Sequence, residues 1–167
     1  SSLVALAIGD ALASVLMVQR GFDKEDFARN HPGGELGKQL ALRVESVMHS
    51  IDDIAQISDS DSITACAVKM TEKPLGVALQ LEGNQLKGIL TEGDLRKSIA
   101  SSNDLNDSIK HFINTNPISI TPSTSILDAM KIMEDRDSQI SCLPIIDSKG
   151  ECSGLITLHD LYQTKLV

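Results

Sequence analysis

Aromatic side chains are nearly absent from this 167-residue chain, which has three Phe, one Tyr and no Trp. Its core must therefore be aliphatic, and 41% of the residues are hydrophobic. Proteins that bind single-stranded nucleic acid stack its bases on aromatic side chains, so this class is disfavoured. Positive charge is scarce as well, because 15 Lys and Arg accompany 23 Asp and Glu for a net charge of −8. We expect no nucleic-acid partner, although a small anionic ligand held by a few local donors stays open.

Cysteine is also scarce, with three residues and no C-x-x-C motif. In a hairpin around residues 148–150, Cys142 faces the neighbourhood of Thr157 and Cys152 that of Asp147, so these cysteines are not disulfide partners. The sequence predicts reduced thiols and a cytoplasmic location. None of the histidines has a metal-ligand spacing such as H-x-x-x-H, so we expect no metal site and no required cofactor.

A long uninterrupted hydrophobic run is missing too. Residues 3–18 are apolar, but Asp10 interrupts them, and no basic segment precedes them as in a signal peptide. A membrane-spanning helix needs about 20 apolar residues in a row, so no membrane association is predicted. We expect a largely buried helix over 3–20 and a short acidic helix over 23–29. The start of the chain inside an apolar segment, without Met, indicates a fragment of a longer protein.

What the sequence does contain is an internal repeat. Residues 88–95 (GILTEGDL) return as residues 154–161 (GLITLHDL), an offset of 154 − 88 = 66. Each block reads as an apolar strand, a Thr, and an Asp three residues later at a helix start. This is the spacing of a capping box, in which the Thr and Asp side chains satisfy backbone N–H groups. Free N–H groups at a helix start can also bind phosphate, so each block is either helix capping or part of a nucleotide site.

The residues around the two blocks predict the order β-α-β-β-α twice, in a mixed α/β (α+β) fold. The first copy is predicted as strand 54–57, helix 62–72, strands 75–81 and 85–90, and helix 94–100. The second copy is predicted as strand 118–120, helix 124–136, strands 140–146 and 152–156, and helix 160–165. Neither copy of roughly 55 residues buries much apolar surface alone, so we expect the two to pair.

This β-α-β-β-α unit, ending in G-h-h-T-x-x-D, resembles the cystathionine β-synthase (CBS) domain, which occurs in tandem pairs. The segment before it resembles the end of a sugar isomerase (SIS) domain, an α/β sandwich. The matching stretches are GDALA at 9–13, RGF at 20–22, DFA at 26–28 and HPGGELGK at 31–38. The resemblance implies a SIS tail over 1–43, a first CBS domain over 44–102 and a second over 103–167.

A SIS domain that leads directly into a CBS pair is similar to the arabinose-5-phosphate isomerase family. That family interconverts ribulose 5-phosphate and arabinose 5-phosphate in the biosynthesis of Kdo, a sugar of lipopolysaccharide. The resemblance implies that His31 is catalytic in the intact enzyme. The family's phosphate-binding loop and other catalytic residues lie upstream of Ser1, so we expect no isomerase activity from this chain alone. A related sugar-phosphate isomerase of capsule or sugar-alcohol metabolism is the alternative parent.

For the CBS pair, the resemblance implies a regulatory role with an adenine nucleotide or a nucleotide sugar such as CMP-Kdo as the effector. The Asp of each block would bind ribose hydroxyls and the Thr would lie near the phosphate. The implied nucleotide-binding residues are Thr91, Asp94, Thr157 and Asp160. Because aromatic residues are few, the base would lie between aliphatic side chains, for which the candidates are Ile57, Val77, Ile120 and Leu143.

Each of these residues also has a structural explanation. The two Thr–Asp pairs could be helix caps only, worth about 0.5–2 kcal/mol each. Arg96 and Lys97 either meet a phosphate or lie on a solvated helix face. His49, His111 and His159 are interpreted as surface or packing residues, although His159 is near enough to the second block to touch a ligand. On this alternative the pair binds nothing and stabilises oligomers. In either case we expect a dimer of the chain and a tetramer of the intact enzyme.

Overall fold

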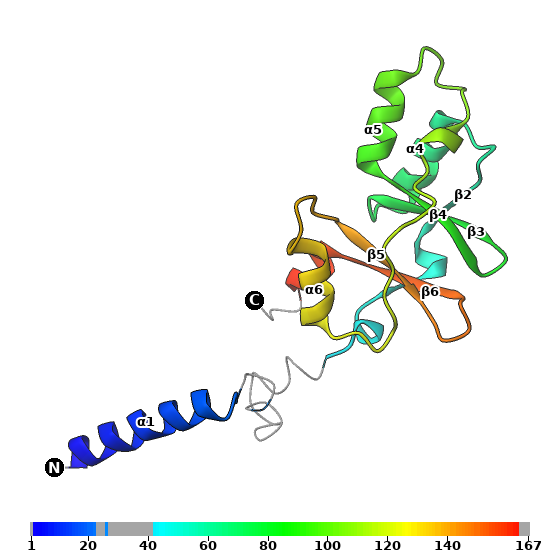
Figure 1. The fold of residues 1–167 in the computed structure, drawn as a ribbon. Coiled ribbons are helices and arrows are strands. Elements are labelled where there is room, and N and C mark those ends of the chain that lie inside the picture. The colour runs from blue at the N-terminus through cyan, green and yellow to red at the C-terminus, as the bar shows by residue number, and fades with distance from the viewer. Residues whose placement is uncertain (1, 23–25, 27–41, 164–167) are drawn as a thin grey trace. The chain divides into compact units, whose positions relative to one another are not determined.

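The computed structural model describes residues 2–22, 26 and 42–163 (Figure 1). The chain divides into two units, Ser1–Leu42 and Arg43–Val167, which are described separately. His31 and, apart from Asp26, the predicted helix over 23–29 lie outside the described residues.

The first unit contains α1 (Ser2–Gln19), which forms where the sequence predicts a helix. Its predicted burial is wrong for this chain, because none of its residues is buried and Val18 is 83% exposed. A helix that is apolar on all sides needs cover on all sides, and the described part of this unit offers no second long element. By length and composition alone α1 could also cross a membrane, a property that core helices of soluble proteins share.

The second unit contains two three-stranded sheets with helices packed on them (Figure 1). The first repeat supplies β1 (His49–Ser50), β2 (Ala55–Ile57), α4 (Ile63–Glu72), β3 (Val77–Glu82), β4 (Gln85–Thr91) and α5 (Glu92–Ser101). The second supplies α6 (Ile126–Glu134), β5 (Cys142–Ile146), β6 (Cys152–Thr157) and α7 (Leu158–Gln163). Short 3-10 helices lie between them at η1 (Val44–Ser46), η2 (Ile51–Asp53) and η3 (Ile109–Phe112). The predicted mixed α/β fold is confirmed.

One predicted strand does not form. Of residues 118–120, only Ile120 pairs, through a single parallel bridge to Ile145. Pro117 and Pro122 flank the segment, and proline has no backbone N–H to donate to a sheet. The corresponding strand of the first repeat, β2, forms a parallel ladder with β3.

The remaining differences lie at the ends of elements. α5 begins two residues before the predicted Asp94, because Thr91 is its N-cap and Asp94 is the third helical residue. α6 covers only part of the predicted range 124–136, because Ser125 caps it. The Gly83-Asn84 turn between β3 and β4 forms as predicted, with Gly83 at φ +59°.

Each sheet is completed by a segment of the other repeat. The strand orders are β1-β6-β5 and β2-β3-β4. β1 starts the first repeat yet pairs with β6 of the second, where His49 lies opposite Leu155. Asn114 likewise precedes the second repeat and forms an antiparallel bridge to Ile89 of β4. Because Ile89 and Leu155 are 66 residues apart, like the two blocks, His49 and Asn114 occupy equivalent positions.

Glycine makes both of these close approaches possible. A Cβ atom on Gly154 would lie 2.2 Å from the carbonyl oxygen of His49. One on Gly88, the equivalent residue, would lie 2.5 Å from Cγ2 of Ile113 and 3.0 Å from the carbonyl oxygen of Asn114. The glycine of each block is therefore required by the crossing segment that packs on it.

The two repeats share a core, as the sequence predicts. One apolar cluster contains buried residues of both sheets, namely Ile54, Val77, Leu79, Ile89, Cys142, Cys152 and Leu155. A second cluster lies between the β2-β3-β4 sheet and α4, and its largest members are Ile57, Ile63, Met70, Leu90, Ile109 and Ile113. The sheets are thus buried on both faces near their centres. The last residues of β4 and β6, Thr91 and Thr157, line a cavity.

Candidate functional site

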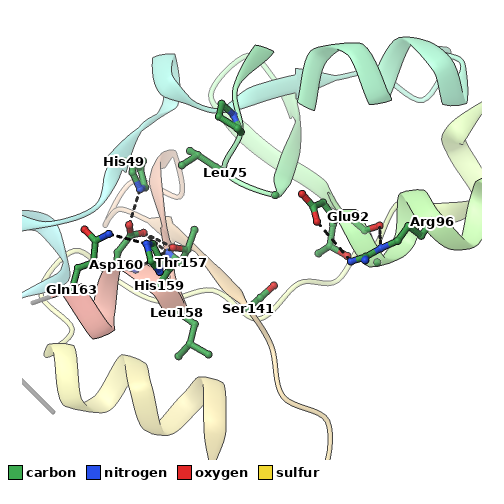
Figure 2. A pocket seen from close by; sticks show the side chains of 14 residues that line it. His49, Leu75, Glu92, Arg96, Ser141, Thr157, Leu158, His159, Asp160 and Gln163 are labelled. Carbon is green, nitrogen blue, oxygen red and sulfur yellow. Dashed lines mark hydrogen bonds and ion pairs between the residues drawn. The ribbon is translucent and has the colours of Figure 1, made fainter. Parts of the chain in front are cut away.

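A cavity of about 840 Å³ lies between the two repeats, where β4 leads into α5 and β6 leads into α7 (Figure 2). This volume is within the usual range for small-molecule sites. Its lining residues are His49, Pro74, Leu75, Gly76, Thr91, Glu92, Gly93, Arg96, Ser141, Thr157, Leu158, His159, Asp160 and Gln163. The starts of α5 and α7 therefore line the same cavity.

The first Thr–Asp motif is a complete capping box. The hydroxyl of Thr91 accepts the Asp94 N–H at 3.3 Å, and Asp94 Oδ2 accepts the Thr91 N–H at 3.3 Å and its O–H at 2.6 Å. Asp94 Oδ1 is 3.2 Å from Nζ of Lys97. Burial alone would raise the pKa of the Asp94 carboxyl, but hydrogen bonds from Thr91 and Lys97 lower it below its usual value. Asp94 is therefore an ionised carboxylate, and both of its oxygens accept hydrogen bonds from the protein.

The second motif repeats this geometry with a different partner. Asp160 Oδ2 accepts the Thr157 N–H at 2.8 Å and its O–H at 2.6 Å, and the Asp160 N–H reaches Thr157 Oγ1 at 3.3 Å. Asp160 Oδ1 lies 3.0 Å from Nε2 of His49, the contact drawn at the left of Figure 2. The Asp160 side chain is 16% exposed and that of His49 30%. Both carboxylates are thus capping groups, and Asp160 also joins α7 to β1.

Three of the four residues predicted to bind nucleotide line the cavity, namely Thr91, Thr157 and Asp160, whereas Asp94 is not among the lining residues. The predicted aliphatic walls are wrong. The residues predicted as walls are Ile57, Val77, Ile120 and Leu143. They are buried in the core, with relative exposures of 0–7%, and they do not line the cavity. Strands covered on both faces place such side chains in the core, so the apolar lining comes from the segments flanking the strands, through Pro74, Leu75 and Leu158.

The basic groups near the cavity differ from one another. Arg96 lines it, is 77% exposed, and holds Glu92 at 3.7 Å across one helical turn. Lys97 pairs with Asp94 and does not line the cavity. His159 does line it, and its Nε2 is 2.7 Å from Nε2 of Gln163. The cavity therefore offers the Arg96 guanidinium from the first repeat and the His159 and Gln163 side chains from the second.

His49 is a cavity-lining residue that the sequence does not single out. The sequence indicates a packing or surface residue, whereas in the structure it lines the cavity and contacts Asp160. No local signal indicates this role, because the two residues are 111 positions apart in the chain. His111, by contrast, is exposed and is not among the lining residues.

The thiols take no part in this site. Burial raises the pKa of Cys66 and of Cys142 to about 11 and also raises that of Cys152. All three are free and buried, and Cys142 lies opposite Thr157 as predicted. At neutral pH such thiols are protonated and poor nucleophiles. Across the described residues, no group of three or more His, Cys, Asp and Glu side chains could hold a metal ion.

Solved structures similar to this one are CBS domain pairs. The CBS pair of protein MJ0100, in complex with 5′-methylthioadenosine and S-adenosyl-L-methionine, matches 74% of this chain and 99% of that one, with a TM-score of 0.65 and 18% identity. CBSX2 in complex with AMP matches 74% of this chain and 96% of that one, with a TM-score of 0.61 and 19% identity. At these identities the likeness concerns the fold.

Curated relatives match nearly the whole chain. Arabinose 5-phosphate isomerase KdsD of Pseudomonas aeruginosa is 38% identical over 163 residues, which are 96% of this chain and 49% of the relative. KdsD of Yersinia pestis is 35% identical over 169 residues, 100% of this chain and 51% of the relative. Arabinose 5-phosphate isomerase GutQ of Escherichia coli K12 is 31% identical over 168 residues, 100% of this chain and 52% of the relative. The chain spans about half the length of these relatives.

The family model of the CBS domain matches residues 44–101 and 109–165, one match for each repeat. These ranges contain both sheets, both Thr–Asp motifs and all of the cavity lining. The chain therefore belongs to the CBS domain family, as a tandem pair homologous to part of the KdsD and GutQ arabinose 5-phosphate isomerases.

Proposed function

We propose that this chain is the regulatory part of a bacterial arabinose-5-phosphate isomerase, and that a nucleotide or nucleotide sugar binds in the cavity between its repeats. The observation that carries the proposal is the shared cavity of about 840 Å³, which is lined by Thr91 of the first motif and by Thr157 and Asp160 of the second, and which is large enough for a nucleotide. CBS pairs of the same fold have been solved with AMP and with S-adenosyl-L-methionine, which supports an adenosine-containing ligand here.

The cavity offers suitable groups for such a ligand. The Asp160 carboxylate suits ribose hydroxyls, and the exposed Arg96 guanidinium suits a phosphate. Adenine nucleotides and CMP-Kdo each carry both ribose hydroxyls and a phosphate. No cofactor is required in this proposal. The assignment of Thr91 and Asp94 to ligand binding stays a prediction from the sequence.

Residues 1–43 would be the tail of a SIS domain, followed by CBS domains over 44–102 and 103–167. The fully exposed apolar α1 fits this division, since the rest of a SIS domain would cover it. His31 would be catalytic in the intact enzyme, which would act in the cytoplasm in Kdo and lipopolysaccharide biosynthesis. The CBS pair would dimerise, and the intact enzyme would be a tetramer.

One observation favours a second candidate, a CBS pair that only stabilises the oligomer. The oxygens of both Asp94 and Asp160 already accept hydrogen bonds from protein donors. A ligand would have to share those acceptors, and the net charge of −8 opposes an anion. We therefore expect modest affinity, with a Kd of about 10–100 μM.

Thermal melting of the 167-residue chain with AMP, ATP, S-adenosyl-L-methionine and CMP-Kdo tests the proposal. At 5 mM, a ligand with that Kd should raise the melting temperature by about 5–15 °C. Sodium phosphate at matched ionic strength is the control. No shift with any of the four compounds would leave the purely structural pair. The same preparation should leave arabinose 5-phosphate unconverted, and conversion would show that the chain is not a regulatory part alone.

A further inference from the structure

The two Thr–Asp motifs share their internal geometry but not the partner of the second carboxylate oxygen. In both, the Thr hydroxyl is 2.6 Å from Asp Oδ2 and the Asp N–H is 3.3 Å from Thr Oγ1. Oδ1 of Asp94 meets Lys97, whose side chain is 74% exposed and lies on the same helix. Oδ1 of Asp160 meets His49, which is 30% exposed and lies on β1.

Two changes between the repeats produce this difference. Gln163 stands 66 positions after Lys97, and it contacts His159 rather than Asp160. Asn114 stands at the position equivalent to His49, and its side chain accepts the backbone N–H of Asn116 at 3.0 Å. The Asp of the first motif therefore pairs with Lys97, a flexible side chain on the same helix. The Asp of the second motif pairs with His49, whose backbone is held in a sheet.

A sheet-held imidazole fixes a carboxylate better than a lysine does. The backbone of His49 is paired in the β1–β6 ladder, and its ring has only two rotatable bonds. Lys97 must order a long side chain to hold its contact, which costs more conformational entropy. An ionised carboxylate has about four acceptor positions, so Asp160 keeps acceptor capacity after its bonds to Thr157 and His49. Asp160 also lines the cavity, and Asp94 does not.

We propose that the cavity takes one hydroxyl-bearing ligand per chain, held by Asp160, and that His49 is the positioning residue that makes the second motif the binding one. This inference rests on the proposed function, because it assumes that a nucleotide or nucleotide sugar enters the cavity. Beyond that function, the inference specifies that the ligand hydroxyls bind at the Asp160 end of the cavity and that one ligand binds per chain. It also specifies that His49, which lies outside the repeated blocks, determines which motif binds.

Isothermal titration of the 167-residue chain with AMP and with CMP-Kdo tests the inference. We expect one equivalent of ligand per chain. Asp160→Asn should weaken binding by about 10- to 100-fold, because a charge-assisted hydrogen bond is lost. Asp94→Asn should weaken it less than about threefold. The two variants lose the same capping contact, so similar melting temperatures without ligand would show that folding does not explain the difference.

Two substitutions at His49 separate positioning from packing. His49→Ala should weaken binding by about 3- to 10-fold. His49→Gln should stay within about twofold of the parent, because a Gln side-chain N–H can take the place of Nε2–H. Asn114→Ala is the matched control at the equivalent position and should leave the Kd unchanged.

The outcomes distinguish this inference from the proposed function. Two equivalents of ligand, equal losses for Asp94→Asn and Asp160→Asn, or no difference between His49→Ala and the parent would overturn the inference and leave nucleotide binding in place. If neither compound binds the parent chain, the proposed function fails, and the inference fails with it.

Discussion

The first repeat is the more completely built of the two. Its β2 forms a parallel ladder with β3, whereas the second repeat has a single bridge between Ile120 and Ile145 in the equivalent place. At the cavity the second repeat is the more extensively connected, because its motif makes the long-range contact between Asp160 and His49. The first motif has only the contact to Lys97 on its own helix.

This comparison shows what the repetition preserves. Besides the apolar pair Leu95 and Leu161, the positions that agree between the two blocks are those where the backbone needs a particular residue, namely the glycine under the crossing segment and the Thr and Asp of the capping box. Two of the positions that differ lie at the cavity, where Glu92 corresponds to Leu158 and Gly93 to His159. The duplicated fold is therefore maintained by caps and close approaches, while the chemistry of the site is asymmetric.

Adding a Cβ atom at the two strand crossings should produce the largest contrast between the repeats. Gly154→Ala forces a side chain against the backbone oxygen of His49, and we expect it to lower the free energy of unfolding by about 2–4 kcal/mol. Gly88→Ala first meets the end of a side chain, Ile113, and should cost about 1–2 kcal/mol. Urea denaturation measures both. Gly93→Ala is the control: Gly93 lies in α5, the nearest atom to an added Cβ is Thr91 Oγ1 at 3.5 Å, and the change should be neutral or stabilising.

Removing the capping hydroxyls should affect the two repeats almost equally. Thr91→Ala and Thr157→Ala each remove the acceptor of one helix N–H, and we expect losses of about 1 kcal/mol in the free energy of unfolding. Urea denaturation without ligand is again the measurement. A loss more than about 1 kcal/mol larger for one variant would contradict the equivalence of the two caps.

Acid should reveal the smallest effect, at the first motif. The pKa of the Asp94 carboxyl is lowered in the folded chain by hydrogen bonds that outweigh its burial. As the pH falls towards about 4, the unfolded chain therefore takes up this proton before the folded chain does, and stability decreases. The contribution is complete above that range and lost below it. Melting temperatures at pH 7, 5 and 3.5 should fall less for Asp94→Asn than for the parent, and equal falls would contradict this.

Local patterns predicted the features that depend on a few neighbouring residues. The capping boxes at Thr91 and Thr157, the turn at Gly83-Asn84 and the register of Cys142 against Thr157 all follow from short-range rules of backbone bonding. The strand predicted over 118–120 failed because its apolar pattern was read without the flanking prolines.

Long-range pairing limited the prediction of the site. The scarcity of aromatic residues predicts aliphatic walls for a base, with Ile57 and Leu143 among the candidates, but the sheets bury these side chains. His49 was overlooked because its role depends on β1 lying beside β6, a pairing with no local signature. In both cases the prediction required knowing which distant segment packs on a strand, and the sequence pattern does not give this.

The exchange of strands between the repeats also affects how the protein is made. A ribosome adds roughly 5–20 residues per second, so Asp160 is synthesised about 6–22 s after His49, from which it is 111 positions away. Until then β1 has no neighbour, and the first repeat cannot close its half of the cavity. The segment of β1 therefore stays unpaired while the second repeat is synthesised, and a chain truncated between the repeats would have an unpaired β1 and would lack the cavity.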